Sequence, residues 1–88
     1  MKSRATPKFW KYYSLLPVDV QRRAEKAYHL WKKNPHHPGL HFKRVDEREP
    51  VYSVRISNDY RALGMREEEA FIWFWIGSHD EYERLLNS

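Results

Sequence analysis

Two arginines and a histidine, each on or just after a predicted strand, are the side chains in the sequence best suited to catalysis. Arg55 lies in the alternating segment Val51–Ser57, Arg61 lies in the next strand-like segment, Tyr60–Met65, and His79 follows the apolar run AFIWFWI. Guanidinium groups bind phosphate through two parallel hydrogen bonds, and imidazole titrates near neutral pH. This set is suited to phosphate binding combined with proton transfer.

A capping box places His79 at the start of the last predicted helix. Ser78 is followed three residues later by Glu81, so each side chain can bond the backbone amide of the other. Tyr82 follows one turn after His79 on the same helix face. Tyr82 can stack on a base or donate its hydroxyl, or it can simply pack the helix against the sheet. His79 can equally be a first-turn residue without a chemical role.

The hairpin that joins the two arginine strands has a register that its apolar face predicts. If Tyr60 shares the buried face with Ile56, the two residues pair across a three-residue tip. Arg55 then lies opposite Arg61 on the other face. Like charges directly opposite destabilise a sheet unless something neutralises them. We favour an anion bound between the two guanidinium groups over nearby carboxylate partners.

The elements that position these side chains are a small sheet and three helices. The run Ala70–Ile76 is apolar at both side-chain parities, as in a central strand covered on both faces. Helical spacing predicts a hairpin of two helices, from about Pro7 to Leu15 and from Pro17 to Asn34. The inward stripe of the second helix is Val20, Ala24, Ala27 and Trp31. His41–Val45 adds a strand, whereas Met1–Thr6 shows no alternation.

These elements predict an α+β fold in one domain, residues 1–88. An N-terminal helical hairpin packs on an antiparallel sheet of three or four strands, and a short C-terminal helix closes the chain. The 88 residues contain no cysteine, no apolar leader and no membrane-spanning apolar segment. We therefore expect a cytoplasmic protein that has no membrane association and no disulfide framework.

The charge is divided unevenly along the chain. Residues 1–45 hold eleven Lys/Arg and two acidic residues, a net +9, whereas residues 46–88 hold five Arg and ten acidic residues, a net −5. This asymmetry favours a polyanionic partner on one surface, although an ordinary solvated face would show it too. Contacts with an RNA backbone are predicted for Lys43, Arg44, Lys32 and Lys33.

The loop Asn34–His41 is rich in proline and histidine and invites comparison with metal sites. It contains His36, His37 and His41, but their spacing matches no strong zinc signature. No cysteine or well-placed carboxylate completes a ligand set. We expect no metal and no other cofactor, and we interpret the loop as a polar segment whose histidines can touch nucleic acid.

Four segments together resemble the RelE/ParE superfamily of bacterial toxins from type II toxin–antitoxin pairs, and most closely its RelE/HigB-like members. They are LPVDVQRRAEKAYHLWKKNP, LHFKRV, VYSVRISNDYRALG and WFWIGSHDEYERLL. The resemblance implies cleavage of mRNA in the A site of the 30S ribosomal subunit. The ribose 2′-OH attacks the neighbouring phosphate, leaving a 2′,3′-cyclic phosphate, and no metal is required. It also implies a cognate antitoxin that wraps the toxin in a hetero-oligomer.

The resemblance assigns roles residue by residue. Arg61 matches the strand arginine that binds the scissile phosphate, and Arg55 matches a basic residue on the preceding strand. His79 falls where RelE has arginine and related members use histidine, and Tyr82 stands for the aromatic residue of the C-terminal segment. Ser53 replaces a second basic residue of RelE. The alternatives are a ParE-like inhibitor that binds DNA gyrase without cleaving RNA, and a catalytically inactive relative.

Overall fold

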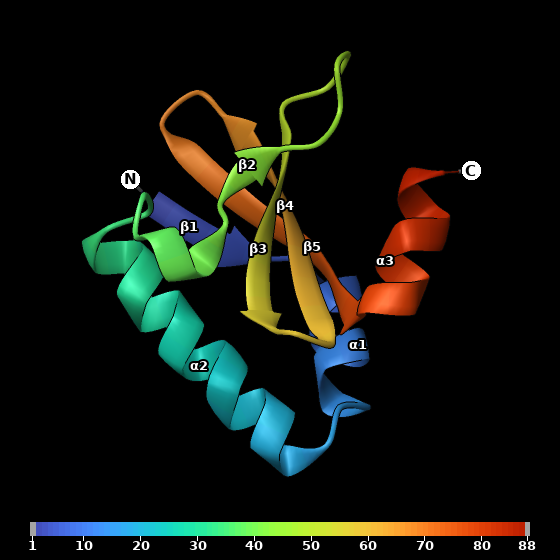
Figure 1. Ribbon diagram of the computed structural model, residues 1–88. Helices are drawn as coiled ribbons and strands as arrows, with labels where there is room; N and C mark the ends of the chain where they lie inside the picture. The colour runs from blue at the N-terminus through green and yellow to red at the C-terminus, as the bar shows by residue number, and fades with distance from the viewer. Residues whose placement is uncertain (1, 88) are drawn as a thin grey trace.

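The computed structural model describes residues 2–87 and shows one five-stranded sheet with helices on both faces (Figure 1). The strand order is β1-β5-β4-β3-β2. Strand β1 (Lys2–Ala5) runs parallel to β5 (Ala70–Ser78), and the other neighbours are antiparallel: β4 (Tyr60–Glu67), β3 (Val51–Ser57) and β2 (Lys43–Arg44). The sheet is therefore mixed, and β5 is an interior strand as predicted.

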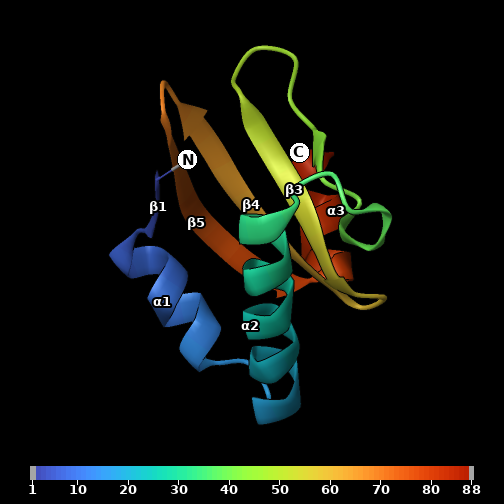
Figure 2. The ribbon, with the colours of Figure 1, turned by 90° about the vertical axis from the view of Figure 1, so that its left-hand side faces the viewer.

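The helices divide between the two faces of the sheet. Helices α1 (Pro7–Ser14) and α2 (Val18–Lys33) cover one face, and α3 (His79–Leu86) lies behind the sheet when the molecule is viewed from the side of α1 and α2 (Figure 2). A short 3₁₀ helix, Pro38–Leu40, leads from α2 towards β2. The predicted α+β fold is confirmed. No helix within residues 2–87 has both the length and the apolar character needed to cross a membrane.

The structure corrects the strand count, because β1 adds a fifth strand to the three or four that the sequence predicts. Its side chains do alternate between exposed and half-buried, but the inward residues are only Ser3 and Ala5. Because these side chains are small, the alternation of apolar residues that would predict a strand is weak here. Backbone bonds hold this edge strand instead, since the amide of Lys2 donates to Glu69 (3.2 Å) and the amide of Thr6 donates to Trp73 (2.9 Å).

Strand β2 is shorter than the predicted strand His41–Val45. His41 has a left-handed backbone conformation, with φ at 45°, and closes the 3₁₀ helix as its C-cap. An extended strand cannot include such a residue, because the chain reverses direction there. Only the two residues after Phe42 pair with β3, so β2 is a short edge strand.

The main core fills the space between the sheet and the two N-terminal helices. Phe71 is fully buried, and its ring centroid lies 5.1 Å from that of Trp31 and 4.6 Å from that of Trp73. Gly64 makes room for this cluster, because a Cβ atom there would lie 2.0 Å from the Phe71 ring. The stripe predicted for α2 is buried as expected: Val20, Ala24, Ala27 and Trp31. An apolar pocket of about 290 Å³, open to solvent, lies between α1, α2 and the sheet.

A smaller apolar cluster lies on the opposite face, under α3. It comprises Leu63, Trp75 and Tyr82. Strict alternation would place Trp75 on the same face as Phe71 and Trp73, but it lies in the other cluster. The pairing of β4 with β5 shifts by one residue, so that Leu63 pairs with Trp75 while its neighbour Gly64 pairs with Trp73. This bulge leaves one extra residue in β5 and turns the Trp75 side chain to the α3 face.

Candidate functional site

Arg55, Arg61 and Gly77 form a row across three adjacent strands. Arg55 of β3 pairs with Arg61 of β4, and Arg61 pairs with Gly77 of β5. Paired residues of neighbouring strands project from the same face of a sheet. The predicted opposition of the two arginines is therefore confirmed, and both point to the face that carries α3.

The hairpin reaches this register by a different route from the predicted one. Ile56 does not pair with Tyr60; Ser57 does, across the two-residue tip Asn58–Asp59. Ile56 is the extra residue of a bulge between Arg55 and Ser57. The bulge keeps Ile56 packed against the main core while the arginines stay opposite one another.

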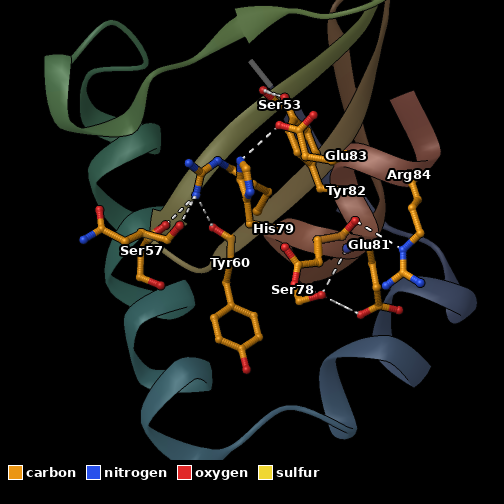
Figure 3. Close-up of polar contacts among 12 residues, drawn as sticks. Ser53, Ser57, Tyr60, Ser78, His79, Glu81, Tyr82, Glu83 and Arg84 are labelled. Carbon is orange, nitrogen blue, oxygen red and sulfur yellow. Dashed lines mark hydrogen bonds and ion pairs between the residues drawn. The ribbon is translucent and has the colours of Figure 1, made fainter. Parts of the chain in front are cut away.

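The hairpin tip supplies neutral acceptors to both guanidinium groups. The Nη1 atom of Arg61 donates to the carbonyl oxygens of Ser57 (2.5 Å), Tyr60 (3.0 Å) and Asn58 (3.4 Å), and Figure 3 shows these bonds at the labelled Ser57 and Tyr60. Arg55 donates from Nη2 to the side-chain carbonyl of Asn58. Within residues 2–87 neither arginine has a carboxylate partner. The tip therefore orients the guanidinium groups without cancelling their charge.

The two arginines also influence one another electrostatically. Partial burial and the Arg55 charge lower the pKa of Arg61, whereas Tyr82, Glu83 and Asp59 act in the opposite direction. A guanidinium group stays protonated at neutral pH in spite of such shifts. The row therefore holds two positive charges close together, and an anion bound between them would relieve their repulsion.

His79 begins α3 directly after β5, and its backbone is tied to the hairpin tip. Its amide donates to the carbonyl oxygen of Asp59 at 2.7 Å. The predicted capping box is present, with the Glu81 amide donating to the Ser78 hydroxyl at 3.2 Å. The imidazole Nε2 lies 3.3 Å from Oε1 of Glu83 (Figure 3). The His79 side chain is 38% exposed, so a ligand at the surface can reach it.

Tyr82 anchors α3 to the sheet. It is 5% exposed and packs in the small cluster with Leu63 and Trp75. Its hydroxyl lies 3.2 Å from that of Ser53, which is itself buried, and its ring centroid lies 5.6 Å from that of His79. A buried ring has no free face for stacking on a base. The geometry therefore supports a packing role for Tyr82, and its predicted chemical role stays a prediction.

The four basic residues predicted to contact RNA do not gather in one place. Lys43 pairs with Ser53, which puts it beside the arginines on the α3 face. Arg44 has the opposite parity and donates to two carbonyl oxygens of the following loop, at 2.9 and 3.3 Å. Lys32 and Lys33 lie in the last turn of α2, on the far side of the sheet. Only Lys43 extends the arginine row.

Three residues at this site were missed by the sequence analysis. Glu83 could have been found, because it follows His79 by four residues on a predicted helix. For Asn58 the sequence indicated only a turn. Trp75 was not singled out in the sequence. A Cβ atom at Gly77 would lie 2.6 Å from its indole, so this ring closes over the row beside Arg61. The bulge that turns Trp75 has no local sequence signal.

The histidine loop is separate from this row. The His37 Nδ1 atom accepts the amide of Gly39 at 3.1 Å, which closes a local turn. In the part of the chain that the structure describes, no three His, Asp or Glu side chains come together as metal ligands. What the arginine row offers is phosphate binding next to an accessible imidazole.

Comparisons with known proteins agree with the fold. The family model of the ParE-like toxin domain matches residues 18–84, and no curated protein matches the sequence. A YoeB/ParE toxin from Agrobacterium tumefaciens superposes with a TM-score of 0.70 at 14% identity, covering 90% of this chain and 99% of that chain. A chain of the RelB–RelE antitoxin–toxin complex from Methanococcus jannaschii gives a TM-score of 0.74 at 12% identity, covering 92% of this chain and 95% of that chain. YafQ from E. coli gives 0.75 at 9%, covering 92% and 96%. At such identities these structures establish the fold alone.

Proposed function

The chain belongs to the ParE-like toxin family, and from that membership and the arginine row we propose that it is an endoribonuclease toxin that cleaves mRNA on the ribosome without a metal ion. The observation that carries the proposal is the pair Arg55–Arg61, held opposite one another by a bulged hairpin and left without carboxylate partners among residues 2–87. A structural charge pair would be expected to find counter-charges within the protein. We infer that this pair instead binds an anion from outside the protein.

The proposed reaction uses the row and His79 in separate roles. Arg55 and Arg61 hold the scissile phosphate and stabilise the charge of its transition state. His79 takes the proton of the ribose 2′-OH as that oxygen bonds to phosphorus. The bond from phosphorus to the 5′-oxygen breaks, and the departing oxygen takes a proton from solvent. The products are a 2′,3′-cyclic phosphate and a 5′-OH end.

The test is primer extension on a defined mRNA in a translating extract, with wild-type protein, His79→Ala and His29→Ala. His29 is exposed on α2, on the far side of the sheet, and serves as the matched control. We expect discrete cuts with wild type and His29→Ala and none with His79→Ala. Intact mRNA with wild-type protein would refute the proposed ribonuclease, and equal cutting by His79→Ala would refute the catalytic role of His79.

Gyrase inhibition is a second candidate, because the matched family takes its name from ParE and a ParE-like inhibitor needs no cleaving residues. In that case Arg61 and His79 are dispensable. A supercoiling assay with purified gyrase separates the two functions. Inhibition that survives Arg61→Ala, together with intact mRNA, would favour the gyrase inhibitor.

We further propose a cognate antitoxin as the physiological partner. Solved relatives include toxins in complex with antitoxins, such as the RelB–RelE complex from M. jannaschii. This chain also exposes large apolar side chains on α1 and at the start of α2: Trp10, Leu15 and Val18. Exposed apolar groups of this size are typical of surfaces that a partner covers. Co-purification of a stable hetero-oligomer from a strain that expresses both proteins would support this proposal.

A further inference from the structure

Glu83 is the acidic residue that the proposed mechanism does not yet use, and its carboxylate faces His79. The Oε1 atom lies 3.3 Å from Nε2 of the imidazole, one helical turn away. The Glu83 side chain is 51% exposed. An exposed pair of this kind contributes little to stability. The pair therefore matters for the orientation of the imidazole rather than for the free energy of unfolding.

The rest of α3 holds this pair in a fixed orientation. The capping box and the bond from the His79 amide to Asp59 fix where the helix begins. Tyr82, between the two residues in sequence, fixes how the helix is rotated, because its ring is buried and its hydroxyl bonds Ser53. His79 and Glu83 thus project from a helix that cannot turn about its axis without exposing Tyr82.

The contact favours one of the two tautomers of the neutral imidazole. An ionised carboxylate only accepts hydrogen bonds, so the nitrogen facing Glu83 must be the donor. Nε2 therefore carries hydrogen in the neutral ring, and Nδ1 carries the lone pair. Among residues 2–87, Nδ1 of His79 has no hydrogen-bond partner. The basic nitrogen is thus the one left for a substrate.

We propose that Glu83 is a positioning residue that holds His79 as the Nε2–H tautomer and so makes Nδ1 the atom that accepts the 2′-OH proton. This inference rests on the proposed ribonuclease function. When Nδ1 takes the proton, the ring becomes an imidazolium whose second N–H already points at a carboxylate. Glu83 then stabilises the positive ring that forms in the transition state, in addition to orienting the neutral ring.

Glu83 should also act against substrate binding. Its charge reaches Arg61, where it opposes the lowering of the arginine pKa. A negative charge so close to the guanidinium row repels a phosphate group in the ground state. Removal of Glu83 should therefore slow turnover while leaving substrate binding equal or tighter. Loss of α3 packing would instead weaken both, so the two effects can be told apart.

The experiment compares Glu83→Ala with Asp80→Asn, which removes an exposed acidic charge from the same helix. Alanine favours helix, so Glu83→Ala should fold. The first readout is the ¹⁵N spectrum of the His79 imidazole in its neutral form. Wild type and Asp80→Asn should show more Nε2–H tautomer than free histidine, and Glu83→Ala should move to the ratio of free histidine. An unchanged ratio in Glu83→Ala would overturn the proposal.

The second readout is cleavage kinetics of the same proteins. We expect kcat to fall about tenfold to a hundredfold in Glu83→Ala, the usual cost of removing such a partner, without a rise in KM. A wild-type kcat in Glu83→Ala, or a rise in KM with no change in kcat, would refute the positioning role. If wild-type protein does not cleave RNA at all, the ribonuclease proposal fails, and the tautomer ratio still decides whether Glu83 positions His79.

Discussion

The two faces of the sheet differ in how the polar groups of their side chains are hydrogen-bonded. On the face of α1 and α2, aromatic rings pack on one another around Phe71, and the buried indole nitrogens of Trp31 and Trp73 have no acceptor among the described residues. On the face of α3, the buried cluster is small, and polar groups bond one another: Tyr82 bonds Ser53, and the arginines bond the hairpin tip.

This difference indicates that one face of the sheet supplies most of the stability, whereas the other carries the charged groups of the candidate site. Burial of apolar surface supplies most of the folding free energy, and here most of it lies on one face. The other face can therefore hold two like charges and an exposed histidine without jeopardising the fold. Substitutions on the two faces should accordingly separate stability from activity.

The largest effect is expected from Phe71→Ala on the face of α1 and α2. Removal of a fully buried phenylalanine leaves a cavity beside Gly64 and should lower the free energy of unfolding by about 3–5 kcal/mol. Urea denaturation followed by tryptophan fluorescence measures this change. Trp10→Ala, at a 55% exposed side chain, should cost far less. Equal costs at the two positions would contradict the argument that burial on this face supplies the stability.

Next in size is the effect of Arg61→Ala on the face of α3. Loss of its charge at the phosphate should lower the cleavage rate by about 100- to 1,000-fold, as for other groups that stabilise transition-state charge. Stability should fall by only about 1 kcal/mol, because the lost bonds to the hairpin tip are partly exposed. Single-turnover cleavage and urea denaturation of the same variant measure both. The control is Arg22→Ala on α2, which should cleave normally.

A smaller effect is expected from Tyr82→Phe. This variant tests whether Tyr82 only packs α3 against the sheet or also takes part in the reaction. The variant loses the bond to Ser53 and should be destabilised by about 1 kcal/mol, with cleavage nearly unchanged. A cleavage rate reduced by orders of magnitude in a folded variant would show instead that the hydroxyl takes part in the reaction. That result would restore the chemical role predicted for this tyrosine from the sequence.

The smallest effect is expected from the lysines that flank the two faces. Lys43→Ala should weaken RNA binding a few-fold and reduce the salt dependence of the association constant by about one unit of logarithmic slope. Lys33→Ala, on the far side of the sheet, should leave the slope unchanged. Fluorescence anisotropy of a labelled single-stranded RNA at several salt concentrations compares them. Equal losses would indicate that the RNA contacts both sides of the molecule.

Much of the scaffold followed from local sequence. The helix starts at Pro7 and His79 depend on capping residues immediately before them, and those signals act within four residues. Arg55 lies opposite Arg61 as predicted, but the pairing is reached through a two-residue tip and a bulge at Ile56 that the sequence did not indicate. The resemblance to the RelE/ParE superfamily is confirmed by the match to the ParE-like toxin domain.

The sequence by itself determined the three helices and the strands β3, β4 and β5, because those features depend on neighbours along the chain. Only the tertiary structure decided that β1 joins β5, that a bulge turns Trp75 to the α3 face, and that Lys43 is separated from Lys33. It also decided that Glu83 faces His79 and that the charge of Glu83 acts on Arg61. These features depend on how segments far apart in the chain pack, and side-chain packing leaves no periodic signal in the sequence.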